Sequence, residues 1–168
     1  MNVKKLCTLA LLTAAALVIF VAEAQIPPVI AVPGVKLGLS NIIVLLTMYL
    51  YGRREGAIVL GLKIVLGSVF SGQLMSFFYS AAGGLLCMAV MSLLKGVLTE
   101  KQIWATSAFG AAAHNIGQLI VAIAILGTEK LVWYLPVLLA SGIVTGLFTG
   151  LCAQLALPRI RKIYRTGR

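Results

Sequence analysis

The sequence predicts an all-α integral membrane protein, a bundle of six transmembrane helices with both termini in the cytoplasm. Three observations support this prediction. The 168 residues are 61% hydrophobic and only 11% charged, whereas soluble domains run at about 45–50% apolar and about 25% charged. The apolar residues form long runs separated by short breaks. Positive charge falls mostly in alternate breaks, as the positive-inside bias of membrane proteins requires.

Each predicted helix is an apolar run that ends at charged residues, glycine or proline. A helix crosses the bilayer core with about 20 residues, and shorter runs suffice where flanking side chains reach the interface. The first three helices are expected at 6–22, 37–51 and 57–71, with Lys63 in the middle of the third. The other three are expected at 74–94, 103–126 and 131–157, the last ending at Pro158. No long linker interrupts these runs, so residues 1–168 are expected to form a single transmembrane domain.

The lysines and arginines fix the orientation of this arrangement. With six spans and a cytoplasmic N-terminus, the outer side holds only Lys36 and Lys130, and Lys63 lies inside a helix. The inner side then holds Lys4, Lys5, Arg53, Arg54, Lys95, Lys101, Arg159, Arg161, Lys162, Arg165 and Arg168. The basic tail is therefore interpreted as a topology signal that contacts lipid headgroups, and not as a nucleic-acid site.

The first helix has an alternative interpretation as a signal peptide. Two lysines, an apolar run and the sequence Ala22-Glu23-Ala24 resemble such a peptide with its cleavage site. The run at 6–22 is longer than the usual apolar region of about 7–15 residues. Retention of the helix is therefore the expectation.

Several kinds of chemistry are excluded by what the chain lacks. Asp is absent and Glu occurs four times, so acid-rich motifs that hold Mg²⁺ and diphosphate cannot be built. Cys7, Cys87 and Cys152 are isolated in apolar runs and are expected to be packing residues. No catalytic triad, nucleotide-binding motif or metal cluster can be assembled. We therefore expect no catalytic residue, no metal and no cofactor.

Polar side chains at membrane depth are the functional candidates, because a charge at the bilayer centre costs about 2.5–3.5 kcal/mol on insertion scales. Lys63 has neither an Asp nor a mid-membrane Glu as a partner in this sequence, so its ammonium group either loses its proton or is compensated by an anionic ligand. Asn41 is expected at the outer mouth of the site, and Glu23 is the one acid near this half of the membrane. The predicted ligand-binding set is Lys36, Asn41, Lys63, His114, Asn115 and Gln118, behind a loop stiffened by Pro27, Pro28 and Pro33. The alternative is that these groups hydrogen-bond one another across the bundle.

Small residues at helical spacing predict close helix contacts, because helices in lipid associate by packing. Gly142, Gly146 and Gly150 form a doubled G-x-x-x-G pattern that is expected to pack within the bundle. Ala10 and Ala14 form a similar pair in the first helix. Internal packing and contact with a partner protein are both open for this pair.

Two motifs resemble the Gx transporter family, whose members are often labelled heptaprenyl diphosphate synthase component I. They are Pro33-Gly34-x-Lys36-Leu37-Gly38-Leu39-x-Asn41 and Ala113-His114-Asn115-x-Gly117-Gln118-Leu119. The resemblance implies a relationship to the S-components of energy-coupling factor importers. Those are six-helix proteins of the bacterial plasma membrane that capture a vitamin or precursor and dock a transmembrane subunit driven by two ATPases. Their docking motif of two alanines four apart would map onto Ala10 and Ala14.

The resemblance and the residues together predict a substrate-binding subunit for a small, anionic vitamin or isoprenoid- or quinone-related precursor. Import would be energised by a separate complex, since no nucleotide site is present in the sequence. A prenyl synthase activity is not expected, because the chain has no Asp. The alternative function is a non-transporting accessory subunit in quinone or isoprenoid metabolism or in an electron-transfer assembly.

Overall fold

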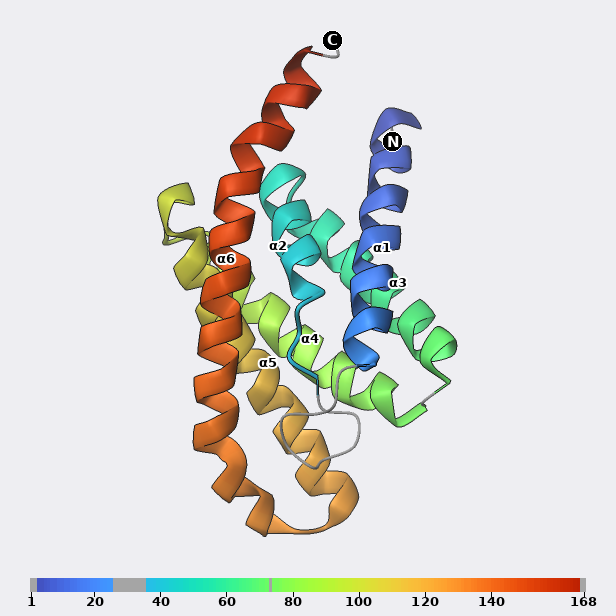
Figure 1. Cartoon of the computed structure of the whole chain (residues 1–168), viewed down its shortest axis with the longest axis vertical. Coiled ribbons are helices and arrows are strands. Elements are labelled where there is room, and N and C mark those ends of the chain that lie inside the picture. The colour runs from blue at the N-terminus through green and yellow to red at the C-terminus, as the bar shows by residue number, and fades with distance from the viewer. Residues whose placement is uncertain (1–2, 26–35, 73, 167–168) are drawn as a thin grey trace.

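The computed structural model describes residues 3–25, 36–72 and 74–166 of the chain, and these residues form a bundle of α-helices (Figure 1). The α-helices are α1 (Val3–Ala24), α2 (Asn41–Leu50), α3 (Arg53–Ser71), α4 (Leu74–Leu94), α5 (Ile103–Leu126) and α6 (Leu135–Thr166). Two short 3₁₀ helices, η1 (Glu100–Gln102) and η2 (Glu129–Tyr134), lead into α5 and α6. The prediction of an all-α fold is confirmed.

Two of the six helices have the predicted bounds, and α6 differs at both ends. The sequence predicts 74–94 and 103–126, as observed for α4 and α5. Helix α6 begins at Leu135 instead of residue 131, because η2 occupies the preceding turns. It also continues past Pro158 to Thr166, where the sequence predicted an end. A proline removes one helical hydrogen bond, but Arg161 holds the later turns through bonds to Glu100 and to Tyr49 O.

The second predicted helix is wrong in length. Helix α2 has ten residues, or about 15 Å of rise, because Gly38 adopts a positive φ of 81° and turns the chain just before it. Gly52 has a φ of 125° and separates α2 from α3, which begins at Arg53 and not at residue 57. The half-length α2 therefore begins inside the bundle, beside the middle of α3.

Helix α5 packs against α4 on one side and α6 on the other, whereas α1 packs mainly on α3. Glycines allow the closest of these contacts. A Cβ on Gly146 would come within 2.7 Å of Ala108 Cα, and one on Gly150 within 2.6 Å of Trp104 Cα, so α6 touches the backbone of α5. Gly142 faces the Asn115 amide in the same interface. The main core contains α2, with Val44, Leu45 and Met48 fully enclosed.

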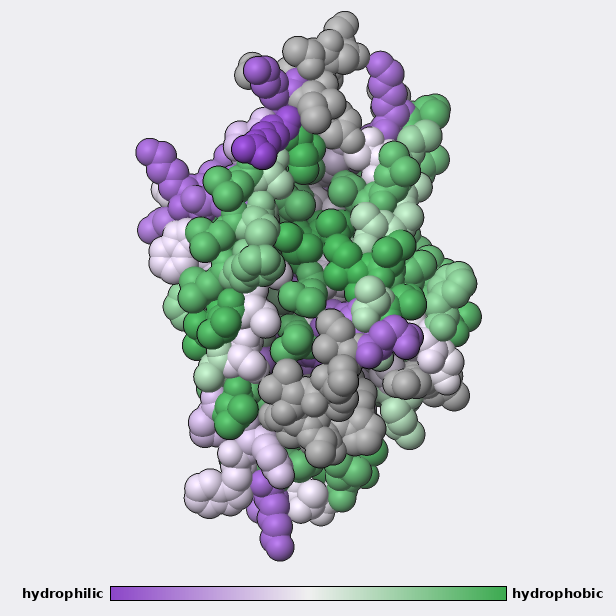
Figure 2. Space-filling model, viewed as in Figure 1, coloured by the Kyte–Doolittle hydropathy of each residue, from purple (hydrophilic) through white to green (hydrophobic). Residues whose placement is uncertain are grey.

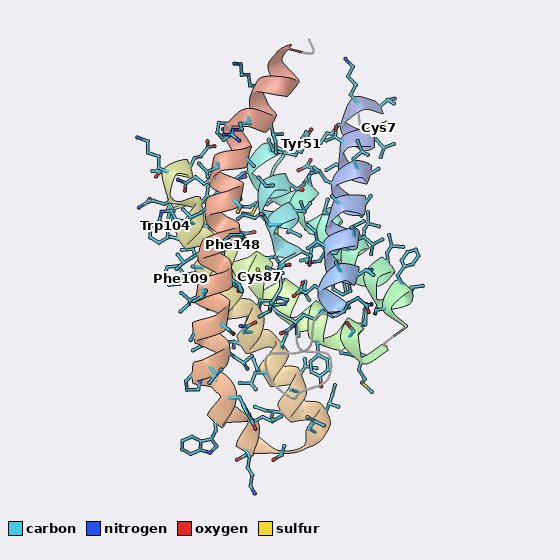
Figure 3. The ribbon with its side chains drawn as sticks, in the orientation of Figure 1. Cys7, Tyr51, Cys87, Trp104, Phe109 and Phe148 are labelled. Carbon is cyan, nitrogen blue, oxygen red and sulfur yellow. The ribbon has the colours of Figure 1, made fainter. Side chains whose placement is uncertain are left out.

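The surface is a broad apolar belt between two polar ends (Figure 2). Trp104, Phe109 and Phe148 point outward from α5 and α6 (Figure 3), and 61% of Phe109 and 66% of Phe148 are exposed. The N-terminal end of α1 and the C-terminal end of α6 lie at the same end of the bundle (Figure 1). We call this the basic end, and ion pairs join Lys5 to Glu55 and Arg161 to Glu100 there.

Within the described residues, four helical segments are long and apolar enough to cross a membrane: Val3–Ala24, Met75–Leu94, Glu100–Leu126 and Glu129–Lys162. Helix α3 has 19 residues but carries Arg53, Arg54, Glu55 and Lys63, and α2 is shorter than a full crossing. Among the described residues the three cysteines are free, and Cys87 is buried while Cys7 is exposed (Figure 3).

Candidate ligand-binding site

The ammonium group of Lys63 is enclosed in the bundle and bound to the start of α2. Lys63 is 3% exposed, and its Nζ donates to Asn41 Oδ1 at 2.7 Å and to Ser40 Oγ at 3.1 Å. The expectation that Lys63 depends on a ligand for compensation is incomplete, because the short α2 begins beside it and supplies two neutral oxygen acceptors. Asn41 was expected at the outer mouth and instead contacts Lys63.

Glu23, near the end of α1, is a charged member of the site that the predicted set did not include. It is 4% exposed, and its Oε1 accepts a hydrogen bond from the Gly38 backbone N–H. The carboxylate interacts electrostatically with Lys63 and Lys36. Its second oxygen, Oε2, is buried without a hydrogen-bond partner among the described residues. The sequence signal was the position of Glu23 as the one acid expected near this half of the membrane.

Phe20 lies one turn before Glu23 on α1, and its ring is close to both ammonium groups. Lys36 Nζ lies 3.6 Å from the centroid of the Phe20 ring, and Lys63 Nζ lies 6.0 Å from it. The ring rests on Gly67 of α3, where a Cβ would come within 2.5 Å of two ring carbons. No sequence signal distinguished Phe20 from other residues of its apolar run. A cation over an aromatic face is stabilised by about 0.5–2 kcal/mol, more where water is excluded.

Gln118 on α5 holds the backbone of Lys36 in place. With its amide oriented to satisfy both ends, its nitrogen donates to Lys36 O at 3.0 Å and its oxygen accepts from Lys36 N–H at 3.2 Å. The same oxygen accepts from His114 Nε2 at 3.1 Å. His114 Nδ1 faces Gly83 on α4, where a Cβ would come within 2.7 Å of it. His114 therefore orients Gln118, which in turn orients the segment that carries Lys36.

Asn115 does not join this group. Its Nδ2 donates to Leu138 O on α6 at 2.5 Å, so its observed contact belongs to the α5–α6 interface. The other five members of the predicted set lie along one connected group of contacts. Pro27, Pro28 and Pro33, which were expected to stiffen the mouth of the site, lie outside the described residues.

The site combines two ammonium groups with one carboxylate, so it carries a net positive charge. Lys36 Nζ and Glu23 Oε2 are buried atoms without hydrogen-bond partners among the described residues. Leaving such groups unpaired costs about 1–3 kcal/mol each. A ligand that offers an acceptor to Lys36 and a donor to Glu23 would satisfy both. Within the described part of the chain no three His, Cys, Asp or Glu side chains are placed to hold a metal.

Ala10 and Ala14 lie elsewhere on α1, on a face that the bundle leaves uncovered. Both are exposed, and so are Leu11 and Val18 beside them, at 72% and 68%. Helix α1 therefore carries part of the site at its C-terminal end and an exposed face of small residues, Ala10 and Ala14, nearer its N-terminal end.

The apolar helices and the belt between two polar ends define a multi-pass membrane protein of the helical-bundle type. Residues 12–156 match the family described as heptaprenyl diphosphate synthase component I, and the chain belongs to that family. No curated protein and no solved structure matches the chain significantly.

Proposed function

We propose that this protein is a substrate-binding membrane subunit that captures a small, anionic organic molecule from the outer side of the bacterial plasma membrane. The cargo class is a vitamin or an isoprenoid- or quinone-related precursor. The observation that supports the proposal is the group formed by Lys63, Lys36 and Glu23, which has a net positive charge and two buried polar atoms, Lys36 Nζ and Glu23 Oε2, without hydrogen-bond partners among the described residues. A desolvated charge persists in a membrane bundle where it faces a cavity, a partner or a ligand.

The half-length α2 favours an anion at this place. A helix has partial positive charge at its N-terminus, and helices that begin inside a membrane protein direct that end toward anionic substrates. In the turn before α2, the Gly38 N–H already donates a hydrogen bond to the Glu23 carboxylate. The carboxylate or phosphate of a ligand would be stabilised at the same position. An arriving anion would bind beside Lys36, opposite Glu23 Oε2.

The topology that we propose has six crossings with both termini in the cytoplasm. Residues 37–51, which include α2, would form the second crossing, and α3 would form the third. The proposal is supported by the basic end, where the beginnings of α1 and α3 lie together through Lys5 and Glu55 and the last turns of α6 join η1 through Arg161 and Glu100. An excess of Lys and Arg favours the cytoplasmic side.

Transport would require a separate transmembrane coupling subunit and two ATPases. Ala10 and Ala14 are the proposed docking residues, because exposed small residues let a partner helix approach closely. We propose no catalytic role for the chain itself. The four glutamates of the sequence include Glu55, paired with Lys5, and Glu100, paired with Arg161, which argues against a shared Mg²⁺-diphosphate site.

Native mass spectrometry of the gently solubilised full chain tests the proposal. We expect a small molecule to co-purify, and the purified molecule to bind Lys63→Met about ten- to a hundred-fold more weakly than wild type. Lys63→Arg should retain much of the affinity. Lys63→Met also removes the hydrogen-bond donor to Asn41 and so destabilises the turn before α2. Lys36→Gln is therefore the second variant, and we expect it to lose the same affinity for the ligand while still folding.

Lys130→Ala, at the far end from the basic end, is the matched control and should bind like wild type. Equal affinity of Lys36→Gln and Lys130→Ala for the ligand would refute the site. A co-purifying protein with no small molecule would refute the proposal in favour of the non-transporting accessory subunit.

A further inference from the structure

A second cluster of charges surrounds a pocket at the basic end, distant in the fold from Lys63. The pocket has a volume of about 480 Å³ and lies between η1 and the last turns of α6. Lys101, Arg161 and Lys162 provide its cationic side chains and Glu100 its carboxylate. Leu157 and Pro158 form the apolar part of the wall.

The side chains that line the pocket carry a net positive charge, because three of them are cationic and one is a carboxylate. Arg161 donates to Glu100 through both terminal nitrogens, at 2.6 and 2.8 Å. Arg161 also donates to Tyr49 O at 3.2 Å, which ties α6 to the end of α2. This arginine therefore holds the wall of the pocket, and Lys101 and Lys162 are the other cationic side chains of the lining. An anion is the complementary occupant.

Gln154 contributes a side-chain acceptor to the lining of the pocket. Gln154 Oε1 is buried without a hydrogen-bond partner among the described residues. An occupant that carries a hydroxyl group would satisfy this side-chain oxygen, so the chemistry favours a phosphate ester with a polyol substituent over bare phosphate.

An apolar surface continues from the pocket toward the belt. Leu155 and Leu151 lie one turn apart on α6, and 65% and 50% of their surfaces are exposed. They lie on the side of the pocket away from the C-terminal end of the helix. A molecule with its phosphate between the cations would place an attached hydrocarbon chain along these leucines, within the apolar belt.

We propose that this pocket binds the headgroup of an anionic glycerophospholipid with a hydroxyl-bearing substituent, such as phosphatidylglycerol. The phosphate would lie with Lys101 and Lys162, the headgroup hydroxyls would donate to Gln154, and an acyl chain would follow Leu155 and Leu151. Basic pockets at the cytoplasmic ends of membrane helices bind acidic headgroups by the same chemistry. This site is independent of the proposed import function.

The test uses the purified full chain in detergent, titrated with phosphatidylglycerol in mixed micelles, with phosphatidylcholine of the same acyl chains as the reference. We expect saturable binding of phosphatidylglycerol in native mass spectra and a rise in the melting temperature that phosphatidylcholine does not give. The double variant Lys101→Gln/Lys162→Gln should bind it about thirty-fold more weakly. Lys130→Gln, at the other end of the bundle, is the matched control and should bind normally.

Two further measurements separate the sources of the phosphate. Gln154→Leu should reduce the preference for phosphatidylglycerol over phosphatidic acid, which lacks the headgroup hydroxyls. Soluble glycerol phosphate should bind far more weakly than the lipid, and equal affinity would overturn the assignment to a lipid. The proposal is also overturned if phosphatidylcholine binds as tightly as phosphatidylglycerol, or if the double variant binds phosphatidylglycerol like wild type. It is overturned too if Lys101 and Lys162 are needed only for an acidic protein to co-purify and not for binding of the lipid.

Discussion

Substituting Gly67 by alanine should displace the Phe20 ring, which lies close to both lysines of the site. A Cβ at this position would lie 2.5 Å from both Cδ1 and Cε1 of Phe20, whereas carbon atoms in contact prefer about 3.5–4.0 Å. The ring must therefore move by about 1 Å, although Phe20 is only 3% exposed and has little room. Such overpacking costs about 1–3 kcal/mol. The movement also disturbs the contact with Lys36 Nζ, now at 3.6 Å from the ring centroid.

Gly61, six residues earlier on the same helix, provides the matched control. A Cβ there meets nothing within 4 Å, so Gly61→Ala should be neutral or should stabilise α3 by about 0.5–1 kcal/mol. Thermal unfolding in one detergent compares the two variants, with an expected loss for Gly67→Ala of about 2–4 °C per kcal/mol. Adding Phe20→Leu should restore stability to Gly67→Ala, as a positive coupling in a double-mutant cycle. Equal melting temperatures for Gly61→Ala and Gly67→Ala would refute the reasoning.

The remaining predictions concern the basic end, the topology and the docking face. A hydrogen bond from Lys5 holds the pKa of the Glu55 carboxyl below its ordinary value of 4.5, so the pair stabilises the fold at neutral pH and this contribution is lost as the pH falls through the lowered pKa. The difference in melting temperature between wild type and Glu55→Gln should therefore close below about pH 4.5, and a difference that persists there would contradict it. Reporters fused at both termini should read cytoplasmic and one at Lys130 external, and an external C-terminus would overturn the six-span topology. Replacing Ala10 and Ala14 by leucine should abolish assembly with the coupling subunit but leave ligand binding by the isolated chain unchanged, and loss of folding would instead assign both residues to internal packing.

The sequence predicts the helices best where local signals and tertiary structure agree. Helix α4 ends at Leu94, directly before Lys95-Gly96, and α5 ends at Leu126, directly before Gly127, which has a positive φ of 63°. The same kind of signal was misread at Gly38, because hydropathy alone does not distinguish a glycine within a helix from one that turns the chain. The start of α2 therefore lies deeper in the bundle than the apolar run indicates.

The residues of the candidate site also fall into two groups: those that the sequence indicates and those that only the tertiary structure brings together. Lys63 was identifiable because a charge in an apolar run is expensive wherever the helix packs. Its contact with Asn41, 22 residues away in sequence, depends on where α2 begins and is a property of the tertiary structure. Glu23 and Phe20 join the site because α1 packs on α3, and no pattern within the first helix indicates that packing.

Helix α1 links the two surfaces that the proposed function requires. Phe20 and Glu23, in its final turns, belong to the candidate ligand-binding site, while Ala10 and Ala14 are exposed on the same rigid helix. Two contacts hold the end of α1 in place: Lys36 on the Phe20 ring, and the hydrogen bond from Gly38 N–H to Glu23. A ligand that displaces either contact changes how firmly this end of α1 is held. A coupling subunit that binds one position of α1 more tightly than another must then change ligand affinity, and by linkage the ligand changes the affinity for the subunit by the same factor. Capture and docking on this fold are therefore expected to be thermodynamically coupled through one helix, without a rearrangement of the α5–α6 pair that glycine contacts hold together.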